Sequence, residues 1–213
     1  MRKYFLLIIF FVIVGCKDSR IKEHKIININ DKIYTENFSD KNFTYKVYYK
    51  KDTTNTIKLK NLIISIDKKT IQEIKLDTIE IPHLYFSIDD DVNFDGYNDI
   101  CILNYEGAYT KTFSFWLYDK NNNKFKHYKG LDEIQNPVII KNKNEICSKW
   151  HSGVSDFYLE KYFWKDGSLI LKEKYEESKT DKIRLTTTKL VNGKYIVKNS
   201  IRKDNVVMFM DCK

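Results

Sequence analysis

A dense group of acidic residues near the middle of the chain is the strongest candidate in the sequence for metal chemistry. Residues 89–102 read Asp-Asp-Asp-Val-Asn-Phe-Asp-Gly-Tyr-Asn-Asp-Ile-Cys-Ile, which places five Asp in one short stretch of a protein with formal net charge +8. Carboxylates this close together repel one another unless a positive charge lies between them. Positions 1, 3, 5, 6 and 9 of an Asp-x-Asn-x-Asp-Gly calcium loop match Asp91, Asn93, Asp95, Gly96 and Asp99.

The spacing predicts Ca²⁺, because hard oxygen ligands of this kind suit it better than a transition metal. Gly96 permits the sharp bend, and the carbonyl of Tyr97 supplies a further oxygen. The loop is not an EF-hand, because position 12 is Ile102 and the flanking runs are short, apolar and β-prone. We therefore expect a strand, a calcium loop and a second strand. The alternative is an Asp/Asn/Gly turn that binds no metal.

The N-terminus has the features of an export signal. Arg2 and Lys3 precede an unbroken apolar run, Tyr4–Val14, that is too short to span a bilayer as a mature helix. The run ends in Ile-Val-Gly-Cys, and a small residue before Cys16 resembles a bacterial lipoprotein signal. This resemblance implies cleavage before Cys16, lipidation of its sulfur and a lipid-anchored protein of the cell envelope. Lys17 follows the Cys, as in outer-membrane lipoproteins, and the protein faces either the periplasm or the outside. The alternative is a signal anchor with an incidental Cys.

The rest of the chain predicts strands. Ile, Tyr and Phe are abundant and Ala is nearly absent, a composition that favours β-structure. Apolar and polar residues alternate in several runs, and hairpin signals occur at 119–124, Lys165-Asp166-Gly167 and Asn192-Gly193. We expect Val206–Met210 to form a last strand. The predicted fold is all-β, an antiparallel, hairpin-rich sandwich or propeller-like meander with the calcium loop between two strands.

Three segments follow from these patterns. Residues 1–15 form the signal peptide, residues 16–40 a lipidated polar tether, and residues 41–213 a single all-β domain. After Cys16, three cysteines remain: Cys101, Cys147 and Cys212. One disulfide with a spare thiol and three buried thiols are both compatible with the sequence.

The composition argues against two classes of function. The Lys residues are spread along alternating strand faces and form no long basic block, so we expect no nucleic-acid partner. The chain has no Gly-x-Ser-x-Gly, His-Glu-x-x-His, phosphate-loop or Rossmann motif, and seven Gly in all exclude a Gly-rich cofactor cradle. The acidic pair Glu176–Glu177 is expected to be solvated at a polar strand end. We therefore expect no enzymatic activity.

Residues 82–164 carry a resemblance to a known family. The calcium loop is followed by an apolar strand, Glu-Gly-Ala at 106–108, Phe-Trp-Leu-Tyr-Asp at 115–119, a polar turn and Lys-Phe at 124–125. This pattern resembles bacterial periplasmic lipoproteins related to the immunity protein of the Xanthomonas bacteria-killing type IV secretion system. That family is similar in fold to the periplasmic inhibitors of invertebrate-type lysozyme. The resemblance implies an all-β domain, a structural Ca²⁺, and inhibition of a peptidoglycan hydrolase as an inhibitor or immunity protein. The alternative is a non-enzymatic lipoprotein that binds a surface or periplasmic ligand, or another envelope protein.

The stretch Ser152–Tyr158 is the candidate inhibitory loop. Gly153 lets the chain turn sharply, and short polar side chains surround it. Lysozyme inhibitors of the resembled type insert a Ser-Gly-containing loop with a nearby Tyr into the cleft of their target. The resemblance implies this role for Ser152, Gly153 and Tyr158, although Tyr158 lies further along the chain than in that short motif. The alternative is a hairpin that only turns the chain.

Overall fold

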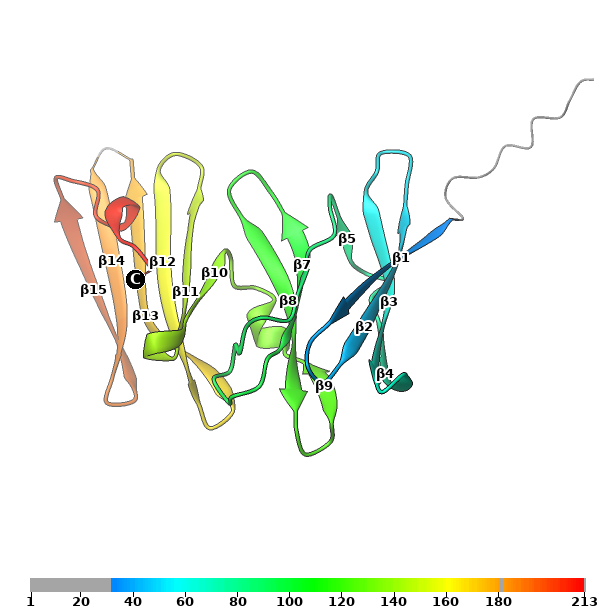
Figure 1. The fold of residues 1–213 in the computed structure, drawn as a ribbon. Helices are drawn as coiled ribbons and strands as arrows, with labels where there is room; N and C mark the ends of the chain where they lie inside the picture. The colour runs from blue at the N-terminus through cyan, green and yellow to red at the C-terminus, as the bar shows by residue number, and fades with distance from the viewer. Residues whose placement is uncertain (1–31, 181, 213) are drawn as a thin grey trace, which may run out of the picture.

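Three antiparallel sheets lie in a row in the computed structural model, which describes residues 32–180 and 182–212 (Figure 1). Strands that follow one another in the sequence are neighbours in each sheet, apart from one short strand that pairs elsewhere. Such pairing needs only hairpin connections between neighbours. The prediction of an all-β, antiparallel and hairpin-rich fold is confirmed. The predicted signal peptide and Cys16 lie outside the described residues.

Sheet A is the N-terminal sheet. Its strands are β1 (Ile33–Ser39), β2 (Thr44–Lys51), β3 (Ile57–Ile66), β4 (Lys69–Lys75) and the short β5 (Glu80–Ile81), which pairs with β3. In β2 the side chains of Tyr45, Val47 and Tyr49 are buried and their neighbours are more exposed, as alternation along a strand requires. The buried face of sheet A packs on the next sheet.

Strand β1 lies within the residues that the sequence assigned to the polar tether. Tyr34 stacks on Tyr49 with ring centroids 5.6 Å apart, and Phe38 packs against Phe86 at 4.5 Å. Tyr34 and Phe38 are four residues apart, so they lie on the same face of the strand. Polar residues between them conceal this pattern in the sequence. The sheet therefore begins at Ile33 and not at residue 41.

Sheet B is the central sheet, and side chains on both of its faces are buried. It contains β6 (Phe86–Ser87), β7 (Ile100–Glu106), β8 (Lys111–Asp119) and β9 (Lys124–His127). In β7, Ile100 and Ile102 belong to the core shared with sheet A, whereas Cys101 belongs to a second core that includes Ile146 of the following sheet. A strand covered on both faces needs apolar residues at successive positions, which explains the unbroken apolar run at the start of β7.

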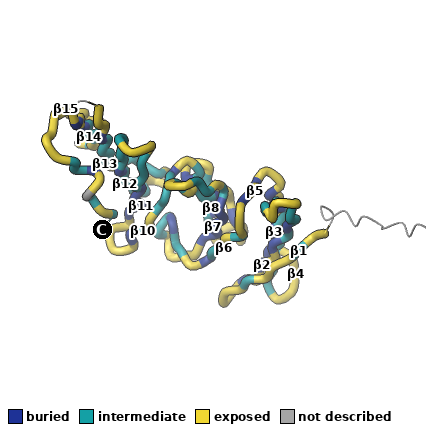
Figure 2. The backbone as a smooth tube through the Cα atoms, turned by 90° about the horizontal axis from the view of Figure 1, so that it is seen from above, coloured by how far each residue is buried: buried dark blue, intermediate teal, exposed yellow. Residues whose placement is uncertain are grey.

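Sheet C is the C-terminal sheet. Its strands are β10 (Pro137–Ile140), β11 (Glu145–Ser152), β12 (Asp156–Lys165), β13 (Ser168–Lys179), β14 (Ile183–Val191) and β15 (Lys194–Arg202). A third core forms where Cys147, Leu159 and Leu185 meet Val207. All nine residues of β15 are exposed, and Figure 2 shows the buried residues concentrated in the inner strands of the row.

Ion pairs connect the polar strands of sheet C. Glu173 of β13 lies 2.9 Å from Lys161 of β12 and 3.1 Å from Lys189 of β14. Burial opposes the ionisation of Glu173, but the two lysines outweigh this effect and lower its pKa to about 2. Glu145 of β11 is buried, unlike the half-buried Glu173, and pairs with Lys172. These contacts allow a sheet rich in Lys and Glu to pack in register.

Two predicted hairpin turns are confirmed in their backbone geometry. The central residues Asp166 and Gly167 have φ angles of 50° and 72°, and Asn192 and Gly193 have 51° and 75°. Positive φ at both positions matches the twist of the two strands that the turn joins, and Asn, Asp and Gly adopt it at least cost. Residue types that favour this conformation therefore predicted both turns correctly from the sequence.

The predicted last strand at Val206–Met210 is wrong. The segment contains the 3-10 helix η4 (Val207–Phe209); among the described residues, η2 (Lys129–Leu131) and η3 (Lys141–Lys143) are also single-turn helices. The carboxylate of Glu177 accepts the backbone N–H groups of Val206 at 2.5 Å and Val207 at 2.9 Å, which holds the helical turn. Glu177, expected to be solvated, is thus a buried acceptor with 1% of its surface exposed.

No helix in the described ranges has the length and apolar character needed to cross a membrane.

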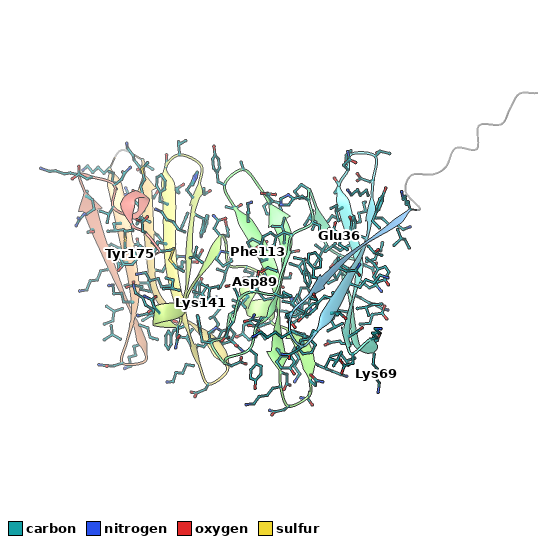
Figure 3. All side chains as sticks on the ribbon, in the orientation of Figure 1. Glu36, Lys69, Asp89, Phe113, Lys141 and Tyr175 are labelled. Carbon is teal, nitrogen blue, oxygen red and sulfur yellow. A yellow bond between two sulfur atoms is a disulfide. The ribbon has the colours of Figure 1, made fainter. Side chains whose placement is uncertain are left out.

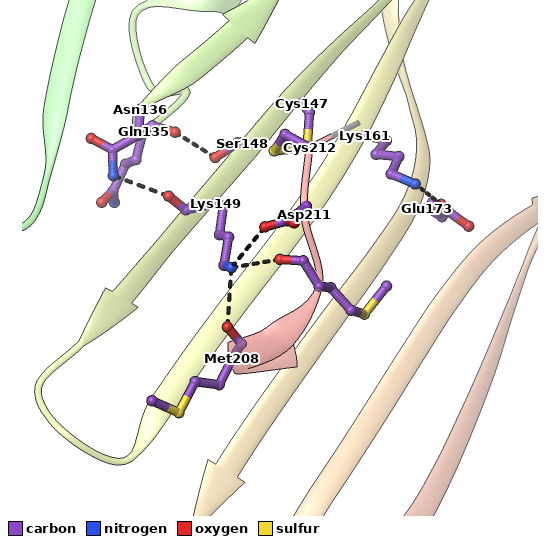
Figure 4. Close-up of a disulfide and its surroundings, with 11 residues drawn as sticks. Gln135, Asn136, Cys147, Ser148, Lys149, Lys161, Glu173, Met208, Asp211 and Cys212 are labelled. Atoms are coloured by element: carbon purple, nitrogen blue, oxygen red, sulfur yellow. Dashed lines mark hydrogen bonds and ion pairs between the residues drawn. A yellow bond between two sulfur atoms is a disulfide. The ribbon is translucent and has the colours of Figure 1, made fainter. Parts of the chain in front are cut away.

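A disulfide between Cys147 and Cys212 ties the end of the chain to β11 (Figure 4). Lys149 strengthens this attachment, because its ammonium donates to the carbonyl oxygens of Met208 at 3.1 Å and Met210 at 2.5 Å. Cys101 is the spare thiol and is buried. Burial raises the pKa of this thiol, so it packs as a small apolar side chain.

Candidate functional site

The predicted calcium loop occupies the connection between β6 and β7 and is wrapped around one carboxylate. Asp91 accepts the backbone N–H groups of Asp95 at 3.0 Å and Gly96 at 2.8 Å. The side-chain oxygen of Asn93 accepts from the Asp95 N–H at 3.2 Å, and Asp95 accepts from the Tyr97 N–H at 3.0 Å. The sharp bend requires Gly96, whose φ is 91°. The structure therefore brings positions 1, 3 and 5 of the loop to its inner side.

Asp99 fastens the end of the loop to the neighbouring strand. Only 1% of its surface is exposed, and its two carboxylate oxygens accept the N–H groups of Val92 at 2.8 Å and Tyr118 at 2.9 Å. Burial raises the pKa of Asp99 to about 7, the nearby charges of Asp95 and Asp91 add to the rise, and the two backbone bonds oppose it. A buried carboxylate in this position favours either a proton or a cation close by.

The loop also joins two sheets, a role that the sequence did not reveal. The indole N–H of Trp164 on β12 donates to the carbonyl of Val92 at 2.8 Å, and Lys141 pairs with Asp90 at 3.3 Å. Figure 3 labels Asp89 on this loop and Lys141 beside it, in the space between sheets B and C. Trp164 is 72 residues from Val92 in sequence, so no local pattern indicates the contact.

The carboxylates of the loop are directed to backbone N–H groups. Within the described part of the chain, no group of three or more His, Cys, Asp or Glu side chains is gathered in the way that a metal ion requires. The candidate ligands of the loop are nevertheless of the kind that calcium loops use, because all of them are hard oxygen donors. The residues fit the ion in chemistry and chain position, and to bind it their carboxylates would have to turn from the backbone N–H groups toward one common point.

The candidate inhibitory loop is the hairpin between β11 and β12, at one end of sheet C. Ser152 pairs with Asp156 at the ends of the two strands, and Gly153 takes a φ of 72° in the turn. Val154 lies at the tip and is 93% exposed, more than any other large apolar side chain in the described residues. The hairpin thus presents Ser152, Gly153 and an apolar side chain directly to solvent.

Tyr158 lies on the strand below this tip. It pairs with Trp150 across the two strands, and their rings stack with centroids 4.0 Å apart and planes 12° apart. The ammonium of Lys174 lies 5.8 Å from the centre of the Tyr158 ring. The structure therefore places Tyr158 as a support of the hairpin, separate from Ser152 and Gly153 at its end.

A second hairpin lies beside the first, and sequence reasoning did not identify it. The β7–β8 hairpin carries Tyr109, whose ring centroid is 4.3 Å from that of His151 on β11. The side chain of Asn136 donates to the carbonyls of Tyr109 at 2.9 Å and Lys149 at 3.0 Å, and accepts from the Lys111 N–H at 2.8 Å. Figure 1 shows both hairpins on the same side of the row of sheets, at the top of the view. We call residues 107–110 and 152–156 together the two-hairpin surface.

A small pocket opens between the two hairpins. Its volume is about 300 Å³, and it is lined mainly by aromatic side chains and Met208 of the C-terminal segment. The lining residues are Tyr109, Asn136, Lys149, Trp150, His151, Phe157 and Met208. Aromatic and Met side chains are the types that dominate the centres of protein interfaces. The geometry is therefore suited to holding a partner group.

The fold and these two features define a class: an all-β protein of three successive antiparallel sheets, with an acidic loop between two strands of the central sheet. A solved structure described as a Xanthomonas type IV secretion system related protein has a similar fold, with a TM-score of 0.61. The alignment covers 80% of this chain and 95% of that chain at 14% sequence identity. No protein-family profile matches the chain, and no curated protein is similar to it in sequence. At this identity the likeness establishes the fold alone.

Proposed function

We propose that this protein is a non-catalytic envelope lipoprotein that inhibits a peptidoglycan hydrolase, as an inhibitor or immunity protein, by inserting the β11–β12 hairpin into its cleft. The observation that carries the proposal is Val154, 93% exposed at the tip of a braced hairpin and flanked by Ser152 and Gly153. A protruding tip is the shape that fills an enzyme cleft. The solved structure of similar fold supports a secretion-associated envelope location, because its description names a secretion-system related protein.

The construction of the hairpin favours tight binding. The Trp150–Tyr158 stack and the Asn136 hydrogen bonds hold the two-hairpin surface in one arrangement before a partner arrives. A surface that is already ordered loses less conformational entropy on association. A Ser152 hydroxyl beside a catalytic carboxylate of the target would donate a hydrogen bond to it. Inhibition then results from occupying the cleft, and no step of chemistry is needed.

We propose in addition that the loop at 91–99 binds a structural Ca²⁺. Asp91, Asn93, Asp95, the carbonyl of Tyr97 and Asp99 would hold the ion, which offsets the mutual repulsion of the carboxylates. The position of the loop supports this role, because it already connects sheets B and C through Trp164 and Lys141. Attachment to the membrane is proposed to occur through a lipid on Cys16.

Inhibition assays with variants of the tip test the docking proposal. Lysozymes of the invertebrate, chicken and goose types are assayed on purified peptidoglycan with the wild-type protein, V154D and S152A. We expect wild type to inhibit at least one, and V154D to weaken inhibition about 30-fold, as for loss of a hot spot worth about 2 kcal/mol. S152A should weaken it by a smaller factor.

A matched control comes from a hairpin at the opposite end of sheet C. Val191 precedes the β14–β15 turn and is 43% exposed, so V191D places the same charge at a comparable site. V191D should inhibit as wild type does. Equal loss in V191D and V154D would contradict docking through the tip. Failure of the wild-type protein to inhibit any of the three enzyme types would favour a lipoprotein that binds some other envelope ligand.

A further inference from the structure

A larger concavity lies at the other end of β8 from the two-hairpin surface and plays no part in the proposed docking. Its volume is about 860 Å³. Four connections form its walls: the β1–β2 turn, the β3–β4 turn, the loop before β7 and the β8–β9 turn. We call it the basal cleft. Its volume lies within the range of small-molecule binding sites.

One wall of the basal cleft is aromatic and firmly supported. Tyr97 is 39% exposed, and its ring centroid lies 5.4 Å from that of Tyr118. Tyr118 in turn packs against Phe43 at 5.4 Å and Phe125 at 5.1 Å, both of which are buried in the core of sheets A and B. The cleft therefore has an exposed ring on a rigid base, which is a surface for stacking.

Two polar side chains that line the cleft have no partner within the part of the chain that the structure describes. The side chains of Asp67 and Asn98 make no hydrogen bond or ion pair with any other described residue. Asp40 differs, because it accepts the backbone N–H groups of Asn42 and Phe43, both at 2.7 Å. Asp67 and Asn98 can thus bond a ligand without breaking an existing contact.

The charge of the basal cleft is opposite to that of the whole protein. Three carboxylates, those of Asp40, Asp67 and Asp89, line it against the single ammonium of Lys41, in a chain of net charge +8. This excess of negative charge repels phosphates and other anions. The Lys120 ammonium lies 5.7 Å from the centre of the Tyr97 ring, and this positive charge beside the cleft disfavours a cationic ligand there. The cleft therefore favours a neutral ligand.

We propose that the basal cleft binds a neutral oligosaccharide. Sugar rings present C–H groups that pack on an aromatic face, here Tyr97, and hydroxyl groups that donate to carboxylates such as Asp67 and bond with amides such as Asn98. The cleft has room for several sugar units, and no charge on the ligand is needed. The site does not depend on the docking hairpin, so each proposal stands or fails separately.

Calorimetric titration with two defined oligosaccharides tests the site. Chitotetraose and cellotetraose are neutral and differ in their acetamido groups, and both are titrated into the full-length protein at fixed calcium concentration. We expect at least one to bind, Y97A to weaken that binding about tenfold through loss of the stacking face, and D67N to weaken it less. Y97A keeps the backbone carbonyl at position 97 and leaves the proposed calcium ligands in place.

The control variant is Y195A, which removes a tyrosine that is 51% exposed on β15, far along the row of sheets. It should bind the sugar as wild type does, and the thermal unfolding of all variants is compared to verify folding. Absence of binding by both oligosaccharides would overturn the proposal. So would Y97A and D67N proteins that fold and bind as tightly as wild type, or an equal loss in Y195A.

Discussion

Removal of the Cys147–Cys212 disulfide should cost the protein a large share of its stability. The two cysteines are 65 residues apart in sequence, so the bond closes a long loop that includes most of sheet C. The entropy of closing a loop of this length in the unfolded chain corresponds to about 4 kcal/mol at 25 °C. We therefore expect the double variant C147A/C212A to unfold with a free energy lower by about that amount.

Urea titration followed by tryptophan fluorescence measures this loss. With a dependence of about 2 kcal/mol per molar urea, a loss of about 4 kcal/mol lowers the midpoint by roughly 2 M. Dithiothreitol should lower the wild-type midpoint to that of the variant and leave the variant unchanged. Trp150 and Trp164 on sheet C, and Trp116 on sheet B, report on two parts of the fold.

A small effect would refute this reasoning. Glu177 and Lys149 also hold the C-terminal segment, through hydrogen bonds to Val206, Val207 and the carbonyls around Met208. If these contacts alone keep the segment in place, the midpoint should move by less than about 0.5 M. The disulfide would then not stabilise the fold by reducing the entropy of the unfolded chain, as proposed here. A response of the variant to dithiothreitol would likewise contradict the assignment of the disulfide.

Three further predictions concern charge, metal and anchor. E173Q should destabilise the protein by about 2 kcal/mol at pH 7. The folded-state pKa of Glu173 is lowered to about 2, so the wild-type protein keeps this advantage above the unfolded pKa near 4.5 and loses it as the pH falls toward 2. Urea titrations at several pH values detect this loss. Addition of Ca²⁺ at 100 times its Kd should stabilise the protein by about 2.7 kcal/mol, EDTA should remove this gain, and D95A should abolish the response in a thermal melt; identical melts with Ca²⁺ and EDTA would refute the metal. C16S should move the protein from the membrane to the soluble envelope fraction, and an unchanged fractionation and mobility would contradict the anchor.

Local patterns in the sequence were sufficient for the fold class and for several turns. The alternation in β2 and the two turns at Asp166-Gly167 and Asn192-Gly193 depend only on a few adjacent residues. They therefore form regardless of where their sheet is placed in the fold. The loop at 91–99 was also visible, because its spacing and its bend at Gly96 are local features. Those patterns did not reveal β1, since only contacts with Tyr49 and Phe86 explain why its two aromatic residues are partly buried.

The tertiary structure alone determined which distant residues meet. Glu177 reads as a solvated acid in sequence, yet it is buried because it caps a helix 29 residues further along. Tyr109 and His151 come from different sheets and form one surface only because Asn136 holds the two hairpins together. The pairing of Cys147 with Cys212, and the cleft beneath Tyr97, likewise depend on how sheets and connections pack. Packing of this kind depends on shape and solvent exclusion summed over many segments, and no short stretch of sequence contains that information.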